Sequence, residues 1–245
     1  MEGKIAVVTG ASRGIGRLIV QNLIQKKSVA KVHAVCILAA ELEELHDEFP
    51  DHVIPHLHDL TNWEATEKLI ASIPEPIDVV VNNAGIAELE SVGSITEASV
   101  DRQLGVNVKS MINVMQCVSR KMKETGTRGS IVNLSSQASH TALRDHLVYC
   151  ASKAAVDGAT RAAALELGPF GIRVNSVQPT VTKTAMALNL WSEEERLSTM
   201  LSRIPLNRLA EVQEVVNAVL FLLDNEQSSM ITGVHLPVDG GFSIA

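Results

Sequence analysis

Residues 5–16 decide the fold and read Ile5-Ala6-Val7-Val8-Thr9-Gly10-Ala11-Ser12-Arg13-Gly14-Ile15-Gly16. The four apolar residues at the start are typical of a short strand buried on both faces of a parallel sheet, and a helical pattern follows to about residue 26. Gly10 permits a tight turn, Gly14 lets the backbone approach a pyrophosphate, and Gly16 lets the helix pack closely on the sheet. Strand, glycines and helix in this order predict a dinucleotide site in which the amino terminus of the helix faces the phosphates.

Strand-like and helix-like segments alternate along the rest of the chain. Further strands are expected at 31–37, 52–57, 77–81, 130–134, 172–177 and 231–236. Helices are expected up to about residue 49, after the capping box Thr61-Asn62-Trp63-Glu64, and over 96–123, 148–167 and 211–224. This alternation predicts one α/β domain over residues 1–245, a doubly wound Rossmann fold with a seven-stranded parallel sheet and helices on both faces.

Polar or glycine-containing motifs follow five of the expected strands. They are Gly10, Asp59, Asn82–Gly85, Ser136 and Pro179. Because ligands of such folds bind at the carboxyl ends of the strands, we expect these positions to converge on one crevice.

The chain contains a single tyrosine, Tyr149, which stands four residues before Lys153 and thirteen after Ser136. On a helix this spacing puts the phenol and the ammonium one turn apart on the same face. A nearby ammonium favours the phenolate, so we expect the pKa of Tyr149 to fall from about 10 toward neutrality, which would make it a usable proton donor and acceptor. A buried tyrosine that only hydrogen-bonds a neighbouring lysine is the alternative.

Composition limits the kinds of partner that the chain can have. The net charge of −7 offers no general attraction for nucleic acid. No apolar stretch approaches the roughly 18–20 residues of a membrane span. Because residues 1–4 lead straight into the first strand, we expect no signal or transit peptide. The three cysteines, Cys36, Cys117 and Cys150, form neither a disulfide framework nor a metal motif. We therefore expect a cytoplasmic protein without a metal site, a membrane span or a nucleic-acid partner.

Five motifs together resemble the short-chain dehydrogenase/reductase family, and the resemblance covers essentially the whole chain. They are TGxxxGxG at 9–16, Asn82-Asn83-Ala84-Gly85, Asn107, Ser136 and Tyr149-x-x-x-Lys153. The resemblance implies that Tyr149 is the general acid/base, that Lys153 lowers its pKa and binds the nicotinamide ribose, and that Ser136 holds the substrate carbonyl. Asn107 would anchor a water that relays protons to Lys153. The hydride must come from a nicotinamide, because no protein side chain can supply one.

A cofactor site is implied at the glycine loop, at the strand ends and after the sixth strand. Its expected residues are Gly10, Ser12, Arg13, Gly14, Ile15, Gly16, Asp59, Leu60, Asn83, Ala84, Gly85, Tyr149, Lys153, Pro179, Thr182 and Thr184.

Selectivity between NAD and NADP normally depends on the end of the second strand, where an acidic residue favours NAD and an arginine favours NADP. This chain has Cys36-Ile37-Leu38 there, with Ile37 at the place where the most similar reductases carry arginine. Arg13 in the glycine loop could still reach a 2′-phosphate, and its alternative role is that of a solvent-exposed loop charge. We expect NADP(H) to be favoured, while use of NAD(H) remains open.

Within the family, three segments resemble the dicarbonyl/L-xylulose reductases, namely residues 62–67, 132–137 and 174–181. That resemblance implies a small carbonyl compound or sugar as substrate. Its binding residues would be Ser136, Gln137, His146, Tyr149 and Trp191. Each of three residues has an alternative role. Gln137 would be a backbone cap, His146 a surface loop residue and Trp191 a packing residue.

Residues 183–203 mix apolar and polar side chains between the sixth strand and the last long helix. This pattern suits either a lid over the substrate or ordinary core packing.

The resemblance also implies a homotetramer, and small residues along the 148–167 helix would let a second subunit approach closely. Two other functions stay open. One is reduction of a 3-oxoacyl thioester or a steroid by the same catalytic set, and the other is a non-enzymatic dinucleotide-binding sensor.

Overall fold

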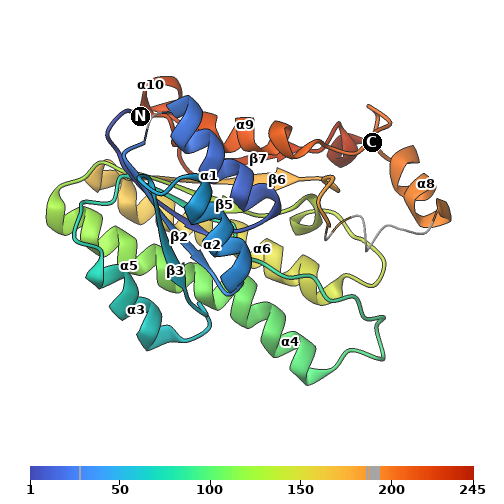
Figure 1. Cartoon of the computed structure of the whole chain (residues 1–245). Coiled ribbons are helices and arrows are strands. Elements are labelled where there is room, and N and C mark those ends of the chain that lie inside the picture. Colours follow the sequence, from blue (N-terminus) through green and yellow to red (C-terminus); the bar gives the residue numbers. More distant parts are fainter. Residues whose placement is uncertain (28, 186, 188–193) are drawn as a thin grey trace.

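The structure is a computed structural model, and it describes residues 1–27, 29–185, 187 and 194–245 (Figure 1). Its sheet has seven parallel strands in the order β3-β2-β1-β4-β5-β6-β7. The strands are β1 (Ile5–Thr9), β2 (Lys31–Cys36), β3 (Val53–Leu57), β4 (Val79–Asn82), β5 (Ser130–Leu134), β6 (Arg173–Pro179) and β7 (His235–Val238). The strand order reverses between β1 and β4, which is where a doubly wound sheet opens a crevice for ligands. The predicted fold class is confirmed.

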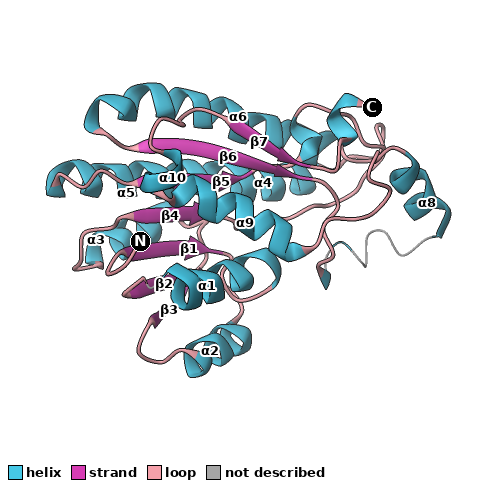
Figure 2. Cartoon of the chain, turned by 90° about the horizontal axis from the view of Figure 1, so that it is seen from above, coloured by secondary structure: helices cyan, strands magenta, loops and turns pink. Residues whose placement is uncertain are grey.

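Helices cover both faces of the sheet, as Figures 1 and 2 show. One core lies between the sheet and the helices α1 (Gly14–Lys27), α2 (Ala39–Glu48) and α9 (Val212–Leu223). The opposite core lies against α3 (Trp63–Ser72), α5 (Ser110–Thr125) and α6 (Leu147–Leu167). The remaining helices are α4 (Glu97–Leu104), α8 (Glu194–Ser202) and α10 (Asn225–Ser228).

The strands are apolar without interruption because both of their faces are buried. In β1, Ala6 and Val8 point into the core beneath α1, whereas Val7 points into the core beneath α5. Successive side chains of a strand alternate between faces, so a strand covered on both sides needs apolar residues at every position.

Two predicted boundaries are corrected by local hydrogen bonds. Helix α3 is capped by Asn62, whose Oδ1 accepts from the amide of Ala65 at 3.1 Å, and not by Thr61. The Thr61 hydroxyl instead donates to Asp59. The last strand begins at His235 and not at residue 231, because Gly233 has a φ of +77°, which interrupts an extended strand.

The long helix expected over 96–123 is present but irregular. Between α4 and α5 the backbone forms a π-helical turn, η1 (Gly105–Lys109), and α5 then runs on to Thr125. Gly126 follows in the left-handed conformation and ends the helix. The irregular turn carries Asn107, and π turns inside helices frequently occur at functional sites.

Candidate active site

A cavity of about 790 Å³ lies at the carboxyl ends of the strands. Most of the residues expected to bind cofactor or substrate line it. They are Gly10, Arg13, Gly14, Ile15, Asp59, Leu60, Asn83, Ala84, Gly85, Ser136, Gln137, His146, Tyr149, Lys153, Pro179, Thr182 and Thr184. Motifs from five separate strand ends therefore do meet at one place.

The glycine loop has the geometry that a bound dinucleotide requires. Gly10 and Gly14 have φ values of +61° and +55°, which glycine adopts without strain. A Cβ on Gly16 would lie 2.1 Å from the carbonyl oxygen of Gly10, so only glycine lets α1 start this close to β1. Gly14 and Ile15 open α1 and also line the cavity, which places the positive end of the helix dipole beside it. The loop thus fits a pyrophosphate.

The end of β4 is tied to the glycine loop by the side chains of Thr9 and Asn83. The Thr9 hydroxyl accepts from the amides of Asn83 and Ala84, at 3.0 and 3.1 Å. Asn83 Nδ2 donates to the carbonyl oxygens of Thr9 and Gly10, at 3.1 and 2.9 Å. These bonds fix the walls of the cavity on both sides of the point where the strand order reverses.

Three expected residues do not line the cavity. Ser12 is 1% exposed and its hydroxyl lies 3.0 Å from the sulfur of Cys36, so its side chain turns toward β2. Gly16 acts in packing, and Asn107 is buried behind the cavity wall. Trp191 lies outside the described residues, as does part of the expected lid.

Tyr149 and Lys153 lie on the first two turns of α6 and both line the cavity, as the spacing predicted. The ammonium of Lys153 donates to the carbonyl oxygen of Leu134 at 2.8 Å and lies 5.7 Å from the centroid of the Tyr149 ring. Ser136 reaches the same place from the end of β5, with its hydroxyl accepting from the amide of Ala138 at 3.1 Å. A phenol, a second hydroxyl and an ammonium therefore face one space.

The expected fall in the pKa of Tyr149 is not found in the structure. Burial raises the pKa of Tyr149 above 10, and the interaction with Ser136 offsets this only in part. Burial also lowers the pKa of Lys153 to about 8, while the charge of Asp157 acts in the opposite direction. The expectation was wrong because desolvation outweighs the attraction between a phenolate and an ammonium that do not touch. At neutral pH the phenol is consequently protonated.

Asn107 is held behind the site by three hydrogen bonds. Its Nδ2 donates to the Ile86 carbonyl and to the Ser152 hydroxyl, at 2.9 and 3.0 Å, and its Oδ1 accepts from the Ile86 amide at 2.8 Å. A Cβ added to Gly85 would lie 3.3 Å from Asn107 Oδ1 and 3.5 Å from Lys153 Nζ. The amide of Asn107 and the ammonium of Lys153 therefore approach the same glycine.

Two polar side chains in the cavity wall lack partners within the protein. Gln137 is 1% exposed, yet among the described residues neither of its amide atoms has a hydrogen-bond partner, so it is not a backbone cap. The hydroxyl of Thr180 is likewise buried and unpaired in that part of the chain. Unpaired buried polar groups are costly, and a polar ligand would satisfy them. Thr180 was not predicted as a site residue, although it directly follows Pro179, one of the expected strand-end positions.

His146 is a buried residue of the cavity wall and not a surface loop residue. It is 4% exposed, it precedes the first residue of α6, and its Nδ1 lies 2.6 Å from the carbonyl oxygen of Arg144. Its ring meets that of Tyr149 edge-on, with centroids 6.0 Å apart. The imidazole therefore limits the space next to the phenol.

The end of β2 also lines the cavity, through Cys36, Ile37 and Leu38. Ile37 is 65% exposed and carries no charge, while Arg13 lies at the same cavity from the glycine loop. The segment 36–38 contains no acidic side chain, so nothing in it would repel a 2′-phosphate.

The described parts of the chain contain neither a membrane-spanning helix nor a metal-ligand cluster. There, no helix is both long and apolar enough to cross a bilayer. In the same residues, no group of histidine, cysteine and carboxylate side chains is arranged to hold a metal ion.

Comparison with known sequences gives full-length relatives. The model of a family described as enoyl-(acyl carrier protein) reductase matches residues 10–243. L-xylulose reductase of Homo sapiens is 46% identical over 242 residues, with 99% of this chain and 97% of that protein covered. D-erythrulose reductase of Gallus gallus is 45% identical over 243 residues, with the same coverage of 99% and 97%.

Solved structures show the same fold over the whole chain. A putative NAD(P)-dependent gluconate 5-dehydrogenase from Beutenbergia cavernae, with bound NADP at low occupancy, superposes with a TM-score of 0.91 at 30% identity and covers 100% of this chain and 98% of its own. A protein described as a short chain dehydrogenase/reductase family protein superposes with a TM-score of 0.90 at 32% identity, covering 99% of both chains.

Sequence and fold agree with these relatives. The relatives are reductases that match from end to end, and this chain has the glycine loop and the Ser136, Tyr149 and Lys153 arrangement in one cavity. The chain belongs to the short-chain dehydrogenase/reductase family, whose members are oxidoreductases that use nicotinamide dinucleotides.

Proposed function

We propose that the chain is an NADP(H)-preferring reductase of small α-dicarbonyls and ketoses such as L-xylulose. The observation that carries this proposal is the pair of unpaired polar side chains, Gln137 and Thr180, in the cavity that holds Tyr149. A ketose or dicarbonyl has a polar oxygen next to its reacting carbonyl, which would pair with them. The names of the sequence relatives, L-xylulose reductase and D-erythrulose reductase, support the same class of substrate.

The dinucleotide would be held by the glycine loop, with Arg13, Gly14 and Ile15, and by the strand-end residues that line the same cavity. When bound, the nicotinamide supplies the hydride that reduces the carbonyl carbon. Arg13 would carry the preference for NADP(H), because it is the cation of the glycine loop at this cavity and the segment 36–38 has no acidic residue to repel a phosphate.

Tyr149 would protonate the carbonyl oxygen of the substrate. Its raised pKa keeps the phenol protonated at neutral pH, which is the form that a reduction needs. The Ser136 hydroxyl would donate a second hydrogen bond to the same oxygen, and two donors in a water-poor site stabilise the negative charge that develops there. Lys153, with a pKa of about 8, would carry the positive charge that stabilises the phenolate left behind. Asn107 would hold a water from which Lys153 and Tyr149 recover the proton.

In the segment 183–203, the first residues would close the site and the last residues would pack as core. Thr184 and Ala187 line the cavity. Leu197, Met200 and Leu201 instead pack with Phe242 in a small separate core. We propose that the lid is confined to the first part of this segment.

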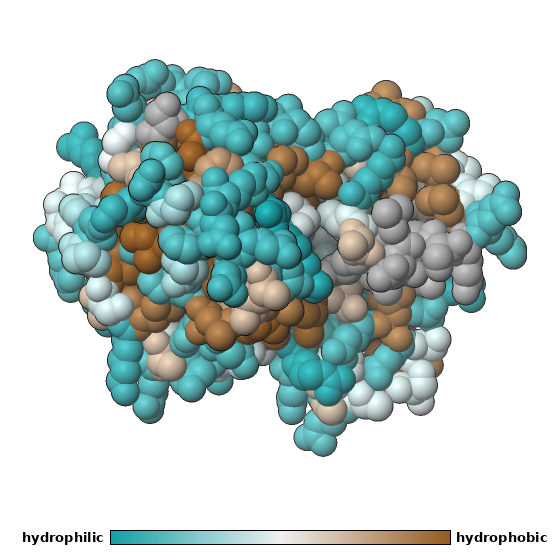
Figure 3. All heavy atoms as spheres, viewed as in Figure 1, coloured by the Kyte–Doolittle hydropathy of each residue, from teal (hydrophilic) through white to brown (hydrophobic). Residues whose placement is uncertain are grey.

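A cytoplasmic homotetramer formed from one domain per chain remains our proposal for the assembly. Several large apolar side chains are exposed, and subunit contacts would remove them from water. They include Leu165, Phe170, Met230 and Ile244. Apolar patches also interrupt the hydrophilic surface on the face shown in Figure 3.

A panel of carbonyl compounds tests the substrate class. Initial rates of NADPH and NADH oxidation are measured with L-xylulose, diacetyl, a 3-oxoacyl thioester and a 3-oxosteroid. The proposal expects the highest kcat/KM with the first two substrates and with NADPH. Faster turnover of the thioester or the steroid would contradict it, and no turnover of any compound would favour the non-enzymatic sensor.

A further inference from the structure

Helix α6 carries a buried carboxylate that the proposed mechanism does not use. Asp157 is 5% exposed and follows Lys153 by four residues, so both side chains leave the same face of the helix. Lys153 is equally buried, at 5% exposed. Burying a charge is costly unless an opposite charge or hydrogen bonds compensate for it, so the two groups have reason to be neighbours.

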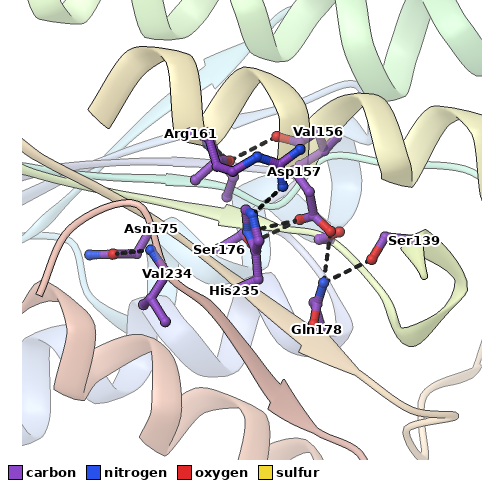
Figure 4. Close-up of polar contacts among 12 residues, drawn as sticks. Ser139, Val156, Asp157, Arg161, Asn175, Ser176, Gln178, Val234 and His235 are labelled. Atoms are coloured by element: carbon purple, nitrogen blue, oxygen red, sulfur yellow. Dashed lines mark hydrogen bonds and ion pairs between the residues drawn. The ribbon is translucent and has the colours of Figure 1, made fainter. Parts of the chain in front are cut away.

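The carboxylate of Asp157 is fixed from the sheet by donors of β6. Its Oδ1 accepts from the Ser176 hydroxyl at 2.9 Å, and its Oδ2 accepts from Gln178 Nε2 at 2.7 Å (Figure 4). Gln178 Nε2 also donates to the hydroxyl of Ser139 at 2.8 Å. These contacts hold the carboxylate in place without supplying a positive charge.

The remaining neighbour, His235 of β7, is neutral. Arg161 lies with its NH1 2.7 Å from His235 Nε2, and because a guanidinium can only donate, Nε2 must be the unprotonated acceptor. The proton of the ring is therefore on Nδ1, which lies 2.7 Å from the Ser176 hydroxyl and 3.4 Å from Asp157 Oδ1 (Figure 4). Burial, first, and the charge of Arg161 lower the pKa of His235, against the attraction of Asp157.

The negative charge of Asp157 is therefore not neutralised by the groups that contact it, and it can act on the nearby ammonium of Lys153. Among the described residues, the only basic group within ion-pair distance of Asp157 is this neutral imidazole. We propose that Asp157 is a positioning residue that keeps the ammonium of Lys153 ionised at working pH. This inference rests on the proposed role of Lys153 in the reaction.

The electrostatics of Lys153 agree with this arrangement. Burial lowers the pKa of Lys153 to about 8, and Asp157 is the charged group that opposes the fall. With Asp157 neutralised, the ammonium would lose its proton at lower pH, and the site would lose its positive charge in the neutral range. The groups that face Asp157 are Ser176 and Gln178 from β6, His235 from β7 and, through Gln178, Ser139 from the turn. None of them carries a negative charge that could replace that of Asp157.

A purely structural role is the competing explanation, because Gln178 and Ser139 link Asp157 to the turn η2 (Gln137–Ser139) next to Ser136. Three variants separate the two roles. Asp157→Asn removes the charge and keeps an oxygen acceptor, Asp157→Glu keeps the charge, and Ser176→Ala removes a hydrogen bond while leaving the charge in place. Asp157→Ser serves as a second neutral variant if the first one does not fold.

The direct measurement is the titration of Lys153 by NMR of protein labelled with ¹³C at the lysine ε-carbons, with the resonance assigned through a Lys153→Arg variant. We expect a midpoint near 8 in the unchanged chain, a similar midpoint in Asp157→Glu and Ser176→Ala, and a lower one in Asp157→Asn. A midpoint that does not fall in the neutral variants would overturn the proposal. Because this titration needs no turnover, failure of the proposed activity would be seen separately.

The pH profile of kcat/KM provides a second readout. Asp157→Asn should lose on the order of three- to ten-fold in kcat/KM at pH 8 and less than about two-fold at pH 6, since an opposite charge within about 4–6 Å shifts a pKa by about one unit or more. An equal loss at both pH values would indicate only a damaged turn and would contradict the role of the charge.

Discussion

The ammonium of Lys153 donates a hydrogen bond to the backbone carbonyl of Leu134, at 2.8 Å. Leu134 is the last residue of β5 and stands two residues before Ser136. The bond therefore fixes the helix that carries Tyr149 relative to the strand end that carries Ser136. The ammonium lies 5.7 Å from the centroid of the Tyr149 ring, so in the proposed mechanism Lys153 would act on Tyr149 through its field and not by a hydrogen bond.

Gly16→Ala should weaken both the fold and the cofactor site. The new methyl group would lie 2.1 Å from the carbonyl oxygen of Gly10 and 2.6 Å from Asn83 Nδ2, and neither can move without disturbing the turn. We expect a loss of about 1–3 kcal/mol in the free energy of unfolding, as for other overpacked sites, together with weaker NADPH binding. Urea unfolding and NADPH fluorescence titration measure the two effects.

Gly105→Ala is the matched control for that substitution. Gly105 has a φ of −57° and nothing within 4 Å of its added Cβ. This alanine should leave stability unchanged or raise it by up to about 1 kcal/mol, because alanine favours helical conformations over glycine. If the two variants unfolded at the same urea concentration, the role assigned to Gly16 would be wrong.

Arg13→Gln should reduce the preference for NADPH over NADH. A hydrogen bond to a charged partner is worth about 1.5–3 kcal/mol, so kcat/KM with NADPH should fall on the order of ten- to hundred-fold, while the value with NADH changes little. Arg17→Gln is the control, because Arg17 is one helical turn away and pairs with Glu44 and Glu48. An unchanged ratio in Arg13→Gln would exclude this arginine as the phosphate contact.

His33 should make the fold sensitive to acid. Burial, first, and the neighbouring His56 lower the pKa of His33 to about 4, while the unfolded chain has the ordinary value of 6.5. Below pH 6.5 the unfolded state therefore binds more protons, and the free energy of unfolding decreases as the pH falls toward 4. Between pH 6.5 and 5 this decrease is about 1.6 kcal/mol, because the slope reaches roughly 1.4 kcal/mol per pH unit only where the unfolded histidine is fully protonated.

Urea unfolding at pH 7 and pH 5 tests this dependence in the unchanged chain and in His33→Gln. The variant should lose less stability between the two pH values. The assignment to His33 would fail if both proteins lost the same amount, since the change would then belong to other groups, such as His56, whose pKa is also lowered.

Local rules explain why much of the site was predictable. The positive φ of Gly10 and Gly14, the shared face of Tyr149 and Lys153, and the strand ends that meet at the cavity follow from residue type and period alone. Each depends on neighbours within a few residues or on a general property of parallel sheets.

The features that the sequence did not reveal depend on contacts between distant segments. The π turn at Asn107 accompanies hydrogen bonds to Ile86 and Ser152. Ser12, which follows β1, turns to Cys36 at the end of the neighbouring strand β2, and the raised pKa of Tyr149 comes from burial by the whole fold. None of these neighbours is specified by a local pattern.

The most direct test of the account compares initial rates of NADPH oxidation with L-xylulose for the unchanged chain and for Tyr149→Phe, with NADPH binding measured for both by fluorescence. Loss of the phenolic proton donor should lower the rate on the order of 10²- to 10⁴-fold, while NADPH binds with little change. Retained turnover in Tyr149→Phe, with NADPH bound, would contradict the assignment of Tyr149 as the group that protonates the substrate.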